Sequence, residues 1–375
     1  MKRFFFSVIA LAAAATACTE SGLIDTPAFY GNEIIFAPYV GKTPVTKAVS
    51  VSKEYLEGTV ENGGGVEVYA FLRDKDVTDP AQIDVTTPYL YAPLTYSNGA
   101  WGYGELAYWP EGKELAFAAY SRNATGCISN HSEGSLTQFD FTVKDVVSEQ
   151  IDLLAIPFKT DVTGNESGDT HVELRFYHLL SRVGFSIEPS EANEDVSITI
   201  KSLKLCGSFP KSGHVDLTKN PAAIAPYKEA TSSYAADYSL LEEGEAFEIE
   251  STACVITDPD TGNESIISKP IYPNAAAENN RFMMILPAAT IGDVQDTDDI
   301  NHNNDRNENV KPYVEVVYQL TGGREETVRA FLEDYGVTGF AAGKWYEFTL
   351  KVSTTAVKFD VKINQGWGDP VEPLE

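Results

Sequence analysis

Apolar and polar residues alternate over short stretches along most of the chain, and this two-residue period is typical of half-buried β-strands. The most regular stretch is 357–364. It places Val357, Phe359, Val361 and Ile363 on one face and Lys358, Asp360, Lys362 and Asn364 on the other. After the N-terminal apolar run, no segment keeps a period of 3.6 residues over three turns, so long helices are not expected.

The same alternation recurs between turn residues, and each recurrence predicts a strand. Asn98-Gly99 favours a two-residue hairpin, and Thr321-Gly322-Gly323 marks a second one. Many short strands between turn signals indicate β-sandwiches. A break in the pattern near Leu180 suggests a boundary between two of them. The predicted strands are 32–40, 66–72, 94–96, 115–120, 135–143, 152–158, 171–187 with that break, 196–205, 246–250, 281–288, 313–320, 326–332, 344–353 and 357–364.

The N-terminus has the form of an export signal. Lys2 and Arg3 precede an uncharged apolar run, 4–15, which is shorter than the about 20 residues that cross a bilayer. The run ends in small residues directly before Cys18, as in a bacterial lipobox, where the thiol is acylated and the chain is cut before it. Ala15 departs from the Leu usual there, and an ordinary secretory signal would be cut at the same place. Residues 1–17 are therefore predicted to be a signal peptide.

Composition excludes some partners. The net charge of -27 and the pI near 4.5 argue against nucleic acid and against electrostatic docking on anionic lipid.

Besides Cys18, the thiols are Cys127, Cys206 and Cys254, an odd number without metal-ligand or redox spacing. Buried, inert thiols are expected, with a Cys206–Cys254 bridge as the alternative.

The sequence contains no motif that clearly indicates a catalytic or metal-binding site. The acidic segment 293–309 fails as an EF-hand loop, because Ile300, Asn301 and Asn307 stand where ligands and a glycine are needed. No HExxH, GxSxG or phosphate loop occurs. His178 lies in an apolar run and is interpreted as a core histidine with a backbone partner. We therefore expect no catalytic, cofactor-binding or metal residues.

An aromatic patch surrounds the Asn98-Gly99 hairpin. It consists of Trp101, Tyr103, Tyr108 and Trp109. Such rings can form a glycan-binding platform, but core packing and sheet edges use them more often. The patch is interpreted as core.

Five places resemble the fimbrillins, the lipoprotein-derived subunits of type V pili of Bacteroidales. They are the signal ending at Cys18, "IIFAPYVGKTPVTKA", "PLTYSNGAWGYGELAYWPEGKELAFAAYS", "VELRFYHLLSRVGFSI", and the end region "GKWYEFTLKV…VKFDVKINQGW". None of them is a catalytic motif, and their order and spacing cover nearly the whole mature chain.

The resemblance implies two tandem transthyretin-like β-sandwich domains, 48–180 and 181–375. It implies export as an outer-membrane lipoprotein, palmitoylated at Cys18, and no enzyme activity. A protease of trypsin-like specificity would cut between Lys47 and Ala48, where Lys replaces the commoner Arg. The cut would release segment 18–47 with its first strand.

Loss of the strand that contains Ile34, Ile35 and Phe36 would open a groove, and a strand from another pilin subunit would fill it. Ile34 and Phe36 are predicted on one face and Ile35 on the other. The segment 356–364 could supply a donor strand or be a permanent member of the second sandwich. The short tail after Trp367 fits a tip or accessory subunit as well as a shaft subunit.

Further partners would be the outer membrane, through the lipid, and a host protein or glycan. The alternative to a pilus subunit is a surface lipoprotein that binds glycans without polymerising.

Overall fold

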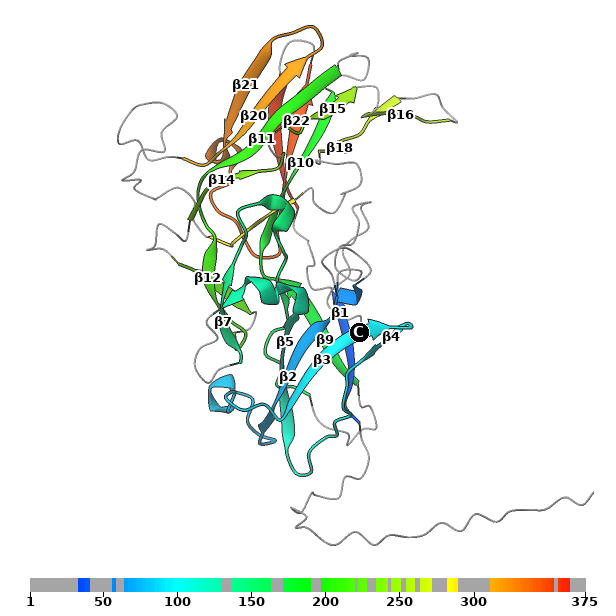
Figure 1. The fold of residues 1–375 in the computed structure, drawn as a ribbon, viewed down its shortest axis with the longest axis vertical. Coiled ribbons are helices and arrows are strands. Elements are labelled where there is room, and N and C mark those ends of the chain that lie inside the picture. The colour runs from blue at the N-terminus through cyan, green and yellow to red at the C-terminus, as the bar shows by residue number, and fades with distance from the viewer. Residues whose placement is uncertain are drawn as a thin grey trace, which may run out of the picture.

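The computed structural model describes residues 33–40, 56–58, 64–129, 136–162, 171–189, 197–219, 222–227, 234–241, 244–250, 254–259, 264–271, 282–288, 311–353 and 357–364. Strands arranged in several sheets make up this part of the chain (Figure 1), which confirms the prediction of an all-β fold. The helical elements with described bounds are short 3₁₀ turns: η1 (Pro80–Gln82), η2 (Arg122–Cys127), η3 (Val147–Glu149) and η7 (Leu332–Tyr335). Over the described ranges, no helix is both long and apolar enough to cross a membrane.

A seven-stranded sheet dominates the lower part of Figure 1. Its pairs are antiparallel except for the edge pair β1–β9, which is parallel. The outermost strands, β1 and β4, also contact each other, so the sheet curls until its two edges meet. In spatial order the strands are β1 (Ile35–Val40), β9 (His171–His178), β8 (Leu154–Ala155), β5 (Glu114–Ser121), β2 (Val66–Arg73), β3 (Leu90–Ser97) and β4 (Ala100–Gly102).

The inner face of this curl encloses a hydrophobic cluster that we call the barrel core. Alternate residues of each strand point into it, as the two-residue period requires. Its buried residues are Ile34, Phe36, Leu56, Val66, Val68, Ala70, Ala92, Leu94, Leu115, Phe117, Ala119, Leu154, Ile156, Val172, Leu174 and Phe176.

The outer face of the same sheet packs on a four-stranded sheet. Side chains such as Phe71 and Tyr120 from the large sheet meet Phe139 and Phe141 from the small one. The small sheet joins strands from both sides of Leu180. Its order is β13 (Ala223–Pro226), β12 (Ser212–Asp216), β7 (Gln138–Thr142) and β6 (Ile128–Ser129).

The second half is a sandwich of two sheets. One contains β18 (Lys269–Pro270), β10 (Ser181–Pro189), β22 (Trp345–Val352) and β23 (Val357–Asn364), with β19 (Phe282–Ile285) also paired to β10. The other contains β14 (Tyr234–Ser239), β11 (Ser197–Pro210), β20 (Tyr313–Leu320) and β21 (Glu325–Phe331), with β15 (Phe247–Glu250) also paired to β11. A separate pair is formed by β16 (Val255–Thr257) and β17 (Glu264–Ile266).

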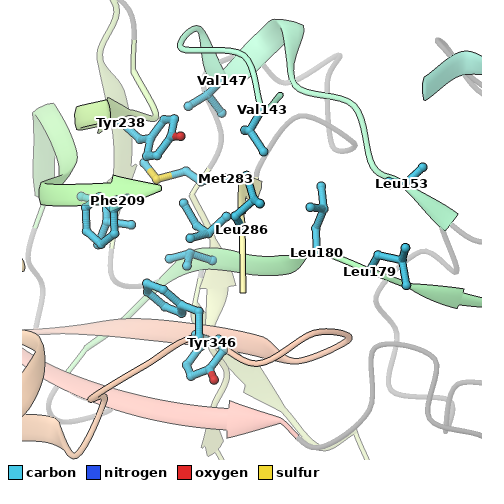
Figure 2. Packing of buried hydrophobic residues seen from close by; sticks show 14 of the residues in the cluster. Val143, Val147, Leu153, Leu179, Leu180, Phe209, Tyr238, Met283, Leu286 and Tyr346 are labelled. Carbon is cyan, nitrogen blue, oxygen red and sulfur yellow. The ribbon is translucent and has the colours of Figure 1, made fainter. Parts of the chain in front are cut away.

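One continuous hydrophobic cluster, which we call the junction core, runs from the outer face of the large sheet into the second sandwich. Figure 2 shows its middle, where Val143 and Val147 from the first half lie near Tyr238 and Met283 from the second. Barrel core and junction core thus lie on opposite faces of one sheet.

The break predicted near Leu180 is a buried junction between β9 and β10. Leu179 and Leu180 have 2% and 0% of their surface exposed. Leu179 N–H donates to the Leu153 carbonyl at 2.9 Å, and Gly343 N–H donates to the Leu180 carbonyl at 2.9 Å. The division into domains 48–180 and 181–375 stays a prediction, because the β12–β13 hairpin, from beyond Leu180, pairs with β7 before it.

Both predicted hairpins are confirmed. Asn98 and Gly99 have φ values of 51° and 83° and connect β3 to β4 with Ser97 opposite Ala100. Positive φ at both positions is the requirement of a type I′ turn, which explains why Asn-Gly occurs here. The second hairpin joins β20 to β21, with Gly322 at a φ of 70°.

The predicted burial of the thiols is also confirmed. Cys127, Cys206 and Cys254 are buried thiols, and no disulfide joins Cys206 to Cys254. Burial raises the pKa of the Cys127 and Cys254 thiols, which keeps both protonated and unreactive at neutral pH. His178 is buried as expected, and its Nδ1 lies 2.5 Å from Oδ2 of Asp152, a carboxylate partner that the sequence pattern did not indicate.

Gly213 in β12 tests whether the crossing hairpin is packed as described. A Cβ there would lie 2.7 Å from Cγ2 of Ile224 and 2.8 Å from the Ala225 carbonyl oxygen, so Gly213→Ala should lower the free energy of unfolding by about 1–3 kcal/mol. Gly102→Ala is the control, since no atom lies within 4 Å of its new Cβ. Urea unfolding of the full chain measures both, and equal stabilities would contradict the packing of β12 on β13.

Candidate functional site

The first strand closes the curled sheet and is the candidate site. Ile34 and Phe36 point into the barrel core, with 0% and 5% of their surface exposed, while Ile35 is half-buried on the opposite face. These three residues therefore lie on the faces that the alternation predicts. Burial of one such large apolar side chain contributes about 1.5–3 kcal/mol relative to exposure.

The backbone of β1 is held on both sides at its start. On one side it runs parallel to β9, with Phe36 opposite Val172 and Pro38 opposite Leu174. On the other side Ile34 N–H donates to the Ala107 carbonyl at 2.8 Å. Pro38 has no N–H to donate, which is tolerated because β1 is an edge strand of its sheet.

Three aromatic rings, Tyr103, Trp109 and Phe117, form what we call the aromatic socket around Phe36. The Phe36 ring meets Tyr103 edge-on at 5.5 Å between centroids and Phe117 at 5.9 Å. Trp109 packs edge-on against Phe117 at 6.0 Å. Edge-to-face pairs contribute about 0.5–1.5 kcal/mol each beyond the area they bury, so the socket favours an aromatic side chain at this position.

Tyr103 contacts the backbone of the first strand as well as its side chain. Its hydroxyl donates to the Ile34 carbonyl at 2.6 Å and accepts from Ala107 N–H at 3.3 Å. Burial raises the pKa of Tyr103, so the hydroxyl remains a donor throughout the neutral range. This residue links the 103–108 segment to β1.

Taken together, the surroundings of β1 can hold an extended peptide segment by backbone pairing and side-chain packing. Without β1, the fully buried Val172, Leu174 and Phe176 of β9 would lose their cover. In the described part of the chain, no group of three or more His, Cys, Asp or Glu side chains could hold a metal ion.

The other predicted site residues, Cys18, Lys47 and Ala48, lie outside the described residues, as does the acidic segment 293–309. The structure therefore places only the strand residues of the predicted site.

The role of the aromatic patch was only half predicted. Trp101, Tyr103 and Trp109 pack against the barrel core, which confirms their interpretation as core residues. What sequence reasoning missed is that Tyr103 and Trp109 line the place of Phe36, 67 to 73 positions away in the chain. An Ile-x-Phe pattern and a cluster of rings around a hairpin were both visible, but no sequence signal joined them.

The sequence model of the fimbrillin-like family matches residues 46–367. No curated protein sequence is significantly similar to the chain.

Solved structures of similar fold include a fimbrial protein from Bacteroides vulgatus, with a TM-score of 0.54 and 14% identity, covering 89% of this chain and 99% of that one. A candidate cell adhesion protein from Bacteroides uniformis has a TM-score of 0.45 and 15% identity over 89% of this chain and 99% of its own. The C-terminally truncated tip fimbrial protein from Porphyromonas gingivalis has a TM-score of 0.38 and 9% identity over 80% and 93%.

Phe36→Ala tests the packing of the first strand. It should lower the free energy of unfolding by about 3–5 kcal/mol. If β1 detaches before the rest of the chain unfolds, the loss is limited to the free energy of that detachment. Urea unfolding measures the loss, and hydrogen exchange at the amides of β9 distinguishes local detachment from global unfolding.

The matched control is Tyr39→Ala on the same strand, because Tyr39 has 40% of its surface exposed. This variant should lower the free energy of unfolding by about 0.5 kcal/mol. Equal losses for the two variants would show that the Phe36 ring is not held in the aromatic socket.

Proposed function

The chain belongs to the fimbrillin-like family, and from this premise we propose that it is an adhesive pilus subunit assembled by proteolysis and β-strand exchange. The family is structural and adhesive, not enzymatic, and its members act at the cell surface in fimbriae. Export as an outer-membrane lipoprotein through Cys18, cleavage after Lys47 and filling of the vacated groove by another pilin subunit are the steps of the proposal.

The observation that carries this proposal is the position of β1. It fills a groove lined by β9 and the 103–108 segment, and it contributes residues to the barrel core alone. None of the described residues of β1 belongs to the junction core, which joins the two halves. Loss of β1 would therefore expose one groove and leave the contacts between the halves in place.

The sequence between β1 and β2 supports a cut. It contains Lys42, Lys47 and Lys53, and the family match begins at residue 46 and leaves β1 outside. After cleavage at Lys47, only backbone pairing and side-chain packing would hold β1. An incoming strand that supplies the same hydrogen bonds and the same buried side chains could then replace it.

The last strand bears on the source of the incoming strand. β23 has the alternation that such a groove requires, but here it pairs with β22 from Val357 to Asn364. Phe359 and Val361 pack against the junction core. A neighbour that donated β23 would first have to detach it from β22. The strand could therefore not belong to its own second sandwich and fill another subunit's groove at the same time.

Lys47→Gln tests the cleavage step. After limited trypsin treatment the wild-type chain should acquire an N-terminus at Ala48 and form a ladder of oligomers, and the variant should do neither. Lys42→Gln is the matched control, because this lysine lies in the same short segment and its loss should leave the Ala48 terminus and the ladder intact. N-terminal sequencing and gel electrophoresis give the answer. A wild-type chain that stays uncut at Lys47, or is cut without assembling, would refute the proposal.

Cys18→Ser tests the anchor. The variant should lose incorporation of labelled palmitate and leave the membrane fraction when expressed in its cell. Cys127→Ser removes a buried thiol instead and should keep both properties. Membrane association of the Cys18 variant at the wild-type level would rule out the lipid anchor.

A further inference from the structure

We propose that Tyr103 is the specificity-determining residue of the groove, and that it selects a strand carrying an aliphatic residue followed two positions later by an aromatic one. The inference rests on the proposed function, since the groove must exchange its strand for selection to occur. The occupant is a strand of a neighbouring subunit in the place of β1.

The two contacts of Tyr103 fall on different parts of that strand. Its hydroxyl donates to the carbonyl of Ile34 at 2.6 Å, and its ring meets the Phe36 ring edge-on at 5.5 Å. The Ile34 side chain is fully buried in the barrel core. Side chains two positions apart share a face of a strand, so an aliphatic-x-aromatic pattern fills both places at once. A strand shifted by one residue would present its other face and lose both fits.

Tyr103 also favours one strand direction. The first strand runs parallel to β9, and at its start Ile34 N–H pairs with Ala107, whose own N–H donates to the Tyr103 hydroxyl. The hydroxyl thus stands where a parallel strand presents a carbonyl. An antiparallel strand would present its N–H and C=O groups in a different pattern.

The rest of the socket makes the selection aromatic rather than merely apolar. Phe117 has none of its surface exposed, and its ring is fixed between Phe36 and Trp109 by edge-on contacts. A Leu in place of Phe36 would keep apolar burial but lose both ring contacts. The preference for Phe over Leu should therefore be about tenfold in affinity.

The test uses the full chain cut with trypsin, with β1 still seated, and two synthetic peptides with the sequence of residues 33–40. One carries the native Phe36, and the other carries the change Phe36→Leu. Displacement of β1 by each peptide is measured by competition, and the ratio of the two affinities is the readout. Folding of every variant is checked by circular dichroism before cleavage.

For the wild-type chain we expect about tenfold tighter binding of the Phe peptide. Tyr103→Leu removes one of the two ring contacts and should reduce this preference to about threefold. Tyr103→Phe keeps the ring and loses the hydroxyl, which weakens the seated β1 and both peptides alike, so it should leave the ratio of the two affinities unchanged. A side chain that only supported the fold would not separate the two variants in this way.

Trp101→Leu is the matched control. Trp101 belongs to the same aromatic patch and packs against the barrel core, but its ring contact is with Tyr96 at 5.3 Å. This variant should keep the wild-type preference. Two results would overturn the role of Tyr103 without contradicting strand exchange. One is a wild-type chain that exchanges β1 for both peptides equally, and the other is a Tyr103→Leu chain that keeps the wild-type preference. Failure of both peptides to displace β1 from the cut wild-type chain would instead refute strand exchange, and the selection with it.

Discussion

The fold depends on one sheet that is apolar on both faces. Every residue of β5 is buried, because its alternate side chains enter the barrel core on one side and the junction core on the other. A sheet of this kind must have both of its apolar faces covered by other parts of the chain. On the outer face the cover is another sheet, but on the inner face the sheet covers itself by curling, and β1 is the strand that completes the curl. The strand is thus held by packing in the barrel core, to which no described residue of the second half contributes.

Much of this architecture could be predicted from the sequence, and the successes have one physical origin. Alternation and turn residues are local signals, so β2, β5, β20 and β23 and the Asn98-Gly99 turn followed from them directly. The faces of Ile34 and Phe36 followed in the same way. The parallel pairing of β1 with β9 did not follow, because a strand pattern does not state its partner. The contact between Tyr103 and Phe36 was missed for the same reason, as it depends on the closure of the whole curl.

The β12–β13 hairpin shows a second limit of local signals. It belongs by sequence to the second half, yet it pairs with β7 of the first. Gln150 strengthens this link, since its Oε1 accepts from Met284 N–H on β19 at 2.6 Å. Val143 adds another, since its N–H donates to the Lys211 carbonyl at 2.7 Å. The halves are therefore joined by backbone pairing, packing and polar contacts.

The described sheets contain two parallel pairs, β1 with β9 and β10 with β22, and they differ in one decisive respect. β10 continues directly from β9 through Leu179 and Leu180, which are buried, so no cut can free it without breaking the junction core. None of the described residues of β1 or of its link to β2 belongs to the junction core, and the link contains Lys42, Lys47 and Lys53. Cleavage after Lys47 would leave the described contacts of β1 with β9 and the barrel core in place. It would only turn an intramolecular partner into a separate ligand, and its effective concentration would fall from that of a tethered strand to that of a free peptide. A competing strand that fits the aromatic socket equally well then needs no stronger contacts than β1 makes. It needs only a higher local concentration, which in the proposed assembly a neighbouring subunit at the same surface would provide.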